Sequence, residues 1–283
     1  MDVPAPIKEL GKTTLTKAAD KFVDFVITKY TGKSIKVFEA EGDIEADKVM
    51  TRWEMLEKPF WLQAEAAKMG RQYTNLGNTL LKAAPRIVSG NDQSVENNDV
   101  FWGLLEHSKE ISNEEMQELI AKIIAGEYNV PGTYSMSTLQ ILKMLGKNEL
   151  ELFEKIGCLL INSSQLPQAL FTGQDNVKVL MRNIGIDFGK LQTLQSLGLI
   201  LPNDMRNTMP NPLKQKMLIQ YFDKNLIFAP ENENFIDVTL PNFYGLSPVG
   251  AQIIKHLEPK YSEEYFSWLK ENFRIPNYKL ELV

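Results

Sequence analysis

An apolar stripe in the middle of the chain constrains the fold more than any other feature of the sequence. Its apolar side chains recur at helical spacing, at Met116, Leu119, Ile120, Ile123 and Ile124. That spacing places them on one face of an α-helix, and such a face packs against the rest of the protein. Ser112 and Glu115 match a capping box at the start of this helix, and Gly126 is a typical C-terminal stop. The sequence therefore predicts one amphipathic helix between residues 112 and 126.

The residues after this stripe predict a turn and further helices. Pro131 and Gly132 suit the two central positions of a type II turn. A second helix is predicted from Ser135 or Ser137 to Leu145, and a third from Asn148 to Leu160. Short connections between successive amphipathic helices are typical of a helical bundle. We therefore expect residues 96–176 to form a helical bundle.

The N-terminal part, residues 1–95, predicts two more helices. One is amphipathic and covers residues 7–31. The other is long and charged, covers residues 39–85, and should be kinked or split at Pro59. A long charged helix either folds back on its own domain or packs against another chain. In the second case we expect it to bind a protein partner or to form a homo-oligomer, with candidate contacts at Trp53, Phe60 and Trp61.

The last part, residues 177–283, has a different pattern. A helix over 186–199 is followed by two strand-like segments, 220–229 and 235–240, with a turn-prone stretch between them. Ser247 and Pro248 then suit the cap and first position of another helix. This order is similar to that of a winged-helix module. The predicted fold class is therefore mainly α: an N-terminal helical bundle with a long charged helix, and a small α+β winged-helix-like C-terminal domain.

The charge of this last part bears on nucleic-acid binding. Residues 180–283 contain 11 Lys and Arg and 11 Asp and Glu, so they carry no net charge. Lys214 and Lys216 are the only close basic pair. Because phosphate contacts need a surplus of cations on one face, nucleic-acid binding is disfavoured. A DNA-binding transcriptional regulator that uses these two lysines stays open as an alternative.

The composition predicts no cofactor and no metal site. The chain has one cysteine and two histidines, and it contains no glycine-rich phosphate-binding motif. The N-terminus does not match a secretory signal, and no stretch is apolar enough to span a bilayer, so a cytoplasmic location is expected. The amphipathic residues 14–30 either pack inside the protein or contact a membrane surface. In the second case the chain would be a membrane-perturbing effector.

The acidic residues near the predicted turn allow two interpretations. Glu127 follows a helix-ending glycine, where the helix dipole disfavours a carboxylate, so it should have a partner. Glu127, Tyr134 and Ser135 flank the predicted turn and form either a structural staple or a binding surface, and Tyr128 is a further candidate for interaction. The other interpretation is an acid–base or metal-dependent hydrolase that uses Glu115, Glu118 and Glu127.

The segment from Ser112 to Leu139, SNEEMQELIAKIIAGEYNVPGTYSMSTL, closely resembles the motif of a bacterial family known as domain of unknown function 2806. Ser137 departs from this motif, which has a basic residue there. The resemblance implies no known reaction. A looser similarity, in layout only, is to the abortive-infection alpha proteins of bacteria, through Leu197–Ile200 and Leu246–Gly250. Together these resemblances suggest a non-enzymatic interaction protein, a sensor or effector component of phage defence.

Overall fold

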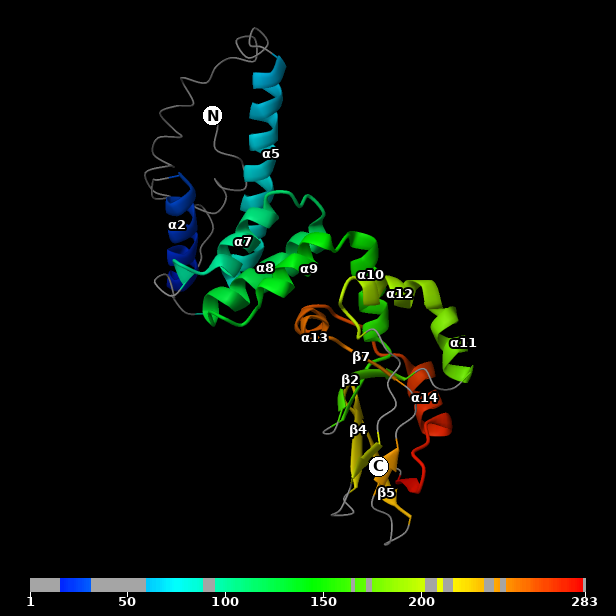
Figure 1. Ribbon diagram of the computed structural model, residues 1–283. Helices are drawn as coiled ribbons and strands as arrows, with labels where there is room; N and C mark the ends of the chain where they lie inside the picture. Colours follow the sequence, from blue (N-terminus) through cyan, green and yellow to red (C-terminus); the bar gives the residue numbers. More distant parts are fainter. Residues whose placement is uncertain are drawn as a thin grey trace. The chain divides into compact units, whose positions relative to one another are not determined.

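The computed structural model describes residues 16–31, 60–88, 95–163, 166–171, 175–201, 208–210, 216–231, 237–239 and 243–281. The chain divides into two compact units, Met1–Lys143 and Met144–Val283. Described residues of the first unit are mainly helical, and the second unit combines helices with a small antiparallel sheet (Figure 1). This confirms the predicted fold class of a mainly α protein with a small β part.

Helices that pack around one apolar core form the first unit. They are α2 (Lys17–Thr31), α5 (Phe60–Ala83), the short 3-10 helix η2 (Ala84–Arg86), α7 (Asp99–Ser108), α8 (Glu114–Asn129) and α9 (Met136–Met144). Helix α8 lies along α5 and also contacts α7 and η2. The predicted apolar stripe of α8 is buried, which confirms the helical interpretation of that stretch.

Helix α2 contributes its apolar face to the same core. Phe22 is fully buried, and its ring lies 4.8 Å from the ring of Tyr128 and 6.5 Å from that of Phe101. Val26 on the same face is also fully buried. The apolar stripe that could have contacted a membrane therefore packs inside the first unit.

The two predicted boundaries of α8 are wrong. The helix begins one residue later than predicted, because Asn113, and not Ser112, accepts the capping hydrogen bond from Met116 N at 3.0 Å. It also continues through Gly126 and ends at Asn129. Of the predicted long helix 39–85, the structure describes α5 from Phe60 onward, and the residues before Phe60 lie outside the described ranges.

The second unit contains α10 (Lys147–Gly157), β1 (Ile161–Ser163), β2 (Leu166–Phe171), α11 (Asp175–Asn183), α12 (Phe188–Ser196), β3 (Thr208–Pro210), β4 (Met217–Tyr221), β5 (Lys224–Pro230), β6 (Asp237–Thr239), β7 (Phe243–Gly245), α13 (Pro248–Ile254), α14 (Glu263–Asn272) and β8 (Tyr278–Glu281). Its main sheet is antiparallel, with strand order β7-β2-β1-β4-β5-β8. Strands β3 and β6 pair separately.

Two predictions for this part of the chain are wrong. Strands β1 and β2 fall within residues 96–176, which were expected to be wholly helical. The segment 220–229, expected as one strand, contains the hairpin of β4 and β5, with Phe222 and Asp223 in its turn. The strand expected at 235–240 corresponds to β6, which pairs with β3 and not with this hairpin.

The helix predicted from Ser247 is confirmed as α13. Ser247 Oγ accepts from Gly250 N at 2.9 Å, and Pro248 occupies the first turn. Ser247 N also donates to Leu199 O at 3.0 Å, so the segment Leu246–Gly250 lies directly against Leu197–Ile200. The contact is very close, because a Cβ on Gly250 would lie 2.0 Å from Leu199 O.

Candidate functional site

The centre of the candidate site is the carboxylate of Glu127 in the last turn of α8, which is fully buried. Its Oε1 accepts from Asn98 Nδ2 and from Gly132 N, both at 2.6 Å. Its Oε2 accepts from Tyr134 N at 2.9 Å. Three donors therefore satisfy the buried charge, and hydrogen bonds to a charged group are the strong ones. The carboxylate joins the end of α8 to the start of α7 and to the loop before α9.

The loop has the geometry that the sequence predicts. Thr133 N donates to Val130 O at 3.2 Å, and Gly132 has a φ of 87°. A positive φ at the third residue is what a type II turn requires, and glycine adopts it without steric cost. The turn directs the amide of Gly132 at Glu127.

Asn98 has two roles that the sequence analysis missed. Its Oδ1 accepts from Phe101 N at 3.0 Å and so caps α7, while its Nδ2 donates to Glu127. The first role has a sequence signal, because an Asn immediately before an apolar helical run is a typical N-cap. The second role depends on two segments meeting in space and has no local signal.

The two tyrosines of the site are buried. Tyr128 is fully buried, and its ring lies 6.0 Å from the ring of Phe101. Burial and the nearby charge of Glu127 raise the pKa of Tyr134 to about 12, so its phenol stays neutral. Tyr134 covers Gly126, where a Cβ would lie 2.8 Å from the phenol oxygen. This contact explains why position 126 is a glycine although the helix continues past it.

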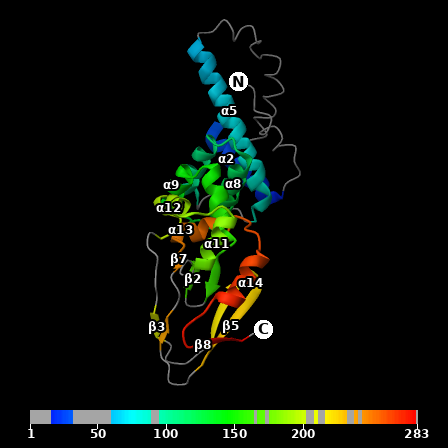
Figure 2. The same cartoon turned by 90° about the vertical axis from the view of Figure 1, so that its right-hand side faces the viewer.

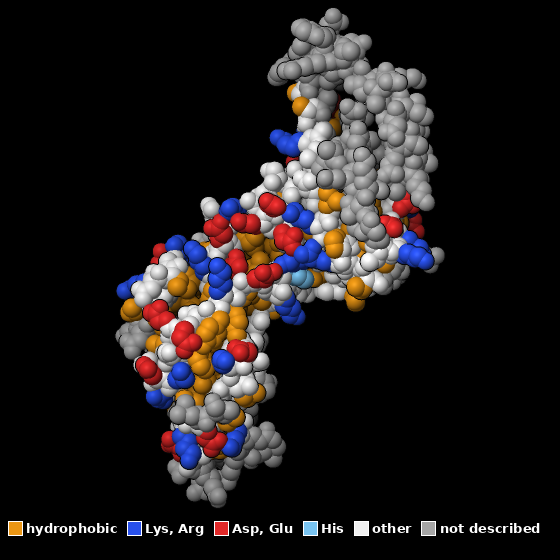
Figure 3. Space-filling model, turned by 180° about the vertical axis from the view of Figure 1, so that it is seen from behind, with side chains coloured by type: hydrophobic (Ala, Val, Ile, Leu, Met, Phe, Trp, Pro, Cys, Tyr) orange, Lys and Arg blue, Asp and Glu red, His pale blue; other side chains and the backbone are white. Residues whose placement is uncertain are grey.

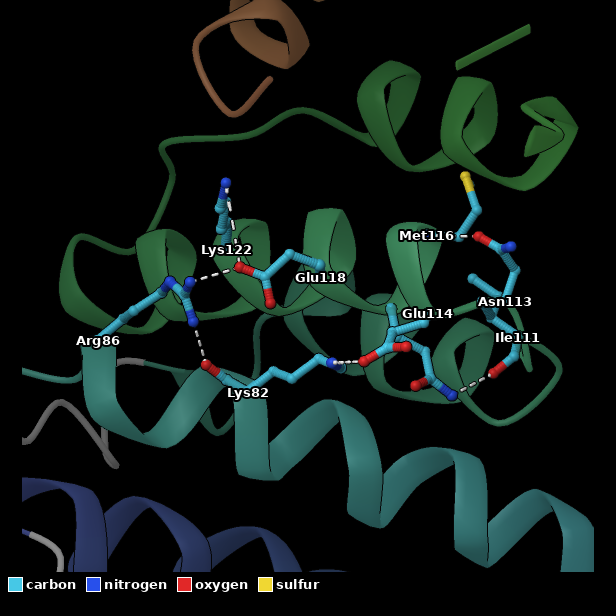
Figure 4. A network of polar contacts seen from close by, with 9 residues as sticks. Lys82, Arg86, Ile111, Asn113, Glu114, Met116, Glu118 and Lys122 are labelled. Carbon is cyan, nitrogen blue, oxygen red and sulfur yellow. Dashed lines mark hydrogen bonds and ion pairs between the residues drawn. The ribbon is translucent and has the colours of Figure 1, made fainter. Parts of the chain in front are cut away.

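A network of charged side chains joins α8 to α5 and η2 (Figure 4). Lys82 Nζ lies 3.2 Å from Glu114 Oε1, and Arg86 pairs with Glu118. Lys122 Nζ lies 4.0 Å from the same Glu118 oxygen. Two cations therefore engage Glu118.

The geometry gives little support to the hydrolase interpretation. Glu127 is saturated with donors, and Glu118 is ion-paired. Within the described ranges, no group of three His, Cys, Asp or Glu side chains is placed to hold a metal ion. Burial also raises the pKa of the half-buried Cys158 thiol, which favours its unreactive form.

Two exposed valines lie beside the fixed turn. Asn129 accepts from Val88 N at 3.0 Å and donates to Arg86 O at 2.9 Å, so residue 88 lies against Asn129, which immediately precedes Val130. Val88 is 80% exposed and Val130 is 64% exposed. We call these two residues the valine surface. No local pattern in the sequence predicts it, since the exposure of a single valine depends on the surrounding fold.

Of the remaining candidate residues, the structure describes the side chain of Lys216. Trp53 and Lys214 lie outside the described residues, as do the side chains of Phe60 and Trp61, whose backbone begins α5. Lys216 Nζ pairs with Glu281 Oε2 at 2.5 Å. On the face seen in Figure 3, acidic and basic side chains are interspersed. Among the described residues no helix is long and apolar enough to span a membrane.

The fold and this site define a mainly helical protein in which a buried carboxylate fixes a surface turn. The chain belongs to the family described as "Protein of unknown function (DUF2806)", which matches residues 64–270. The match includes the whole of α8 and the turn after it, and it confirms the resemblance seen in the sequence. No curated protein and no solved structure matches the chain.

Proposed function

We propose that this chain is a non-enzymatic bacterial protein that binds a protein partner in the cytoplasm as a component of phage defence. We further propose that the valine surface is its contact site. The observation that carries this proposal is the pair of exposed valines on a backbone that polar contacts hold fixed.

The valine surface suits binding for two reasons. Apolar side chains that are solvated in the free protein favour association when a partner buries them. Glu127 and Asn129 hold the backbone on both sides of Val130, so little conformational entropy is lost when a partner binds. The same contacts support a binding role over catalysis, because they use the carboxylate that chemistry would need.

The defence part of the proposal rests on the similarity in layout to abortive-infection alpha proteins. The two segments that carry this similarity, Leu197–Ile200 and Leu246–Gly250, are adjacent in the fold. That adjacency supports treating them as one structural feature. The alternatives of DNA binding through a winged-helix-like domain and of partner or self-association through helix 39–85 stay predictions. Membrane contact through residues 14–30 is less favoured, because the apolar face of α2 is buried in the first unit.

A plaque assay tests the proposal. Bacteria that express the chain with its native neighbouring genes are infected with a phage panel, and the efficiency of plating is compared with that of cells lacking the chain. We expect protection by the wild type and its loss in the double variant V88D/V130D. The matched control is Val179→Asp, because Val179 is also exposed, at 52%, but lies on α11. Absence of protection by the wild type would contradict the defence role.

Equal loss of protection in V179D and in V88D/V130D would contradict the assignment of the site. To separate binding from folding, the circular dichroism spectra and melting temperatures of the purified variants are compared. Both variants replace only solvent-exposed side chains, so we expect melting temperatures close to that of the wild type.

A further inference from the structure

One edge strand of the main sheet, β7, is covered by a neighbouring segment, whereas the other, β8, is open on its outer side among the described strands. At the β7 edge, Leu201 N donates to Gly245 O at 2.9 Å, and Ile200 forms a bridge with Leu246. This segment closes that edge. At the other edge, β8 pairs with β5, and no described strand lies on its outer side (Figure 2). An open strand edge presents unpaired N–H and C=O groups to other strands.

The register of β8 shows which backbone groups point outward. Pro230 faces Tyr278, and Glu231 N donates to Asn277 O at 2.9 Å. A bond in this position shows that Pro230 and Tyr278 exchange no hydrogen bonds with each other. Along an antiparallel pair of strands, such pairs alternate with pairs that do exchange hydrogen bonds. Lys279 and Glu281 therefore bond to β5, whereas the N–H and C=O of Leu280 point away from it.

We propose that β8 pairs antiparallel with β8 of a second copy of this chain, about a two-fold axis at Leu280. In this register the two Leu280 residues exchange both of their hydrogen bonds. The axis also places Lys279 of one copy directly opposite Glu281 of the other, on the same face of the sheet. Opposite charges at such positions stabilise a strand pair.

The side chains of β8 fit this pairing. Lys279 is exposed and has no ion-pair partner among the described residues. Glu281 pairs with Lys216, yet its side chain is still 37% exposed and can accept a second cation. Two complementary contacts therefore form at once, one on each side of the axis. This charge pattern selects a second copy over an arbitrary strand. Because the edge is short, the association is weak and depends on concentration.

Sedimentation velocity of the full chain over a range of concentrations tests the proposal. We expect a monomer–dimer equilibrium in the wild type. Leu280→Pro removes an outward N–H that β5 does not use, and it should abolish the dimer. Lys279→Glu or Glu281→Lys places like charges opposite each other, and each should weaken association about tenfold. The control, Lys255→Glu, changes an exposed lysine outside this edge and should leave the equilibrium unchanged.

Mixing the two charge variants gives the decisive result. A K279E copy carries Glu at both positions, and an E281K copy carries Lys at both. In the mixed pair a Glu therefore faces a Lys on both sides of the axis, so the mixture should associate more strongly than either variant alone. A wild type that is monomeric at all concentrations would overturn the proposal. So would a dimer that K279E leaves unchanged, or a mixture that associates no better than its components. If L280P fails to fold, the charge variants decide the question by themselves.

Discussion

The buried carboxylate of Glu127 is predicted to stabilise the protein through its three hydrogen bonds. In Glu127→Gln the amide keeps one acceptor but turns its NH₂ toward donors such as Tyr134 N, which leaves buried polar groups unpaired. We expect the free energy of unfolding to fall by about 2–3 kcal/mol. Urea denaturation measures the change.

The control for this variant is Glu114→Gln. The Glu114 side chain is 86% exposed, and its ion pair with Lys82 is a surface contact. Such pairs contribute about 0–1 kcal/mol, so the control should remain close to the wild type. If both variants lost the same stability, the three hydrogen bonds of Glu127 would not be what holds the turn.

His107 is predicted to make stability depend on pH. Burial lowers its pKa below 6.5, although a contact from Nε2 to Leu142 O at 3.2 Å opposes the shift. The unfolded state therefore takes up the proton at a higher pH than the folded state does. As the pH falls from about 6.5 through the lower pKa of the folded state, this proton uptake lowers the free energy of unfolding.

The variant His107→Gln tests this dependence. Unfolding is measured between about pH 7 and pH 5, and the loss of stability over that interval should be smaller in H107Q than in the wild type. His256→Gln is the control. Parallel curves for the wild type and H107Q would show that this histidine does not contribute.

At the scale of single elements, two glycines within helices predict opposite effects of the same substitution. At Gly70 in α5 an added Cβ would have no atom within 4 Å, whereas at Gly126 in α8 it would meet Tyr134. Gly70→Ala should stabilise the protein by about 0.5–1 kcal/mol, because alanine favours helix. Gly126→Ala gains the same propensity but displaces a buried ring, so a net loss of about 1 kcal/mol is expected. Urea denaturation compares the two, and stabilisation by G126A would contradict the packing argument.

The elements also show how far sequence reasoning reaches. Periodicity predicts the stripe of α8 correctly, because every apolar residue of that stripe is buried on one face. The β4–β5 hairpin is missed because its turn contains Phe222, and phenylalanine is not a typical turn residue. Phe222 adopts a φ of 51°, and its ring packs 4.9 Å from Tyr221 and 5.8 Å from Tyr261. The contact with Tyr261, which is far away in the sequence, helps to offset the cost of that conformation.

The same limit applies to β1 and β2 and to the site. Short apolar runs do not distinguish a strand from a buried helix. The partners that fix β1 and β2 as strands are β4 and β7, which come much later in the chain. Likewise the sequence marks Glu127 as needing a partner, but it does not identify Asn98. Local patterns thus predict the helices, the Ser247 cap and the type II turn, whereas contacts between distant segments decide the strand pairing and the partner of Glu127.

At the scale of the whole molecule, the two compact units each contain a core of their own. Gly250→Ala should disrupt the second unit, because the new Cβ would lie 2.0 Å from backbone Leu199 O, which no side-chain movement relieves. Hydrogen exchange followed by mass spectrometry should show lost protection in peptides from residues 144–283 of this variant. The E127Q variant should show the reverse, with the loss confined to residues 1–143. If either substitution lowered protection equally in both units, the chain would unfold as one cooperative body, and stability could not be assigned to separate cores.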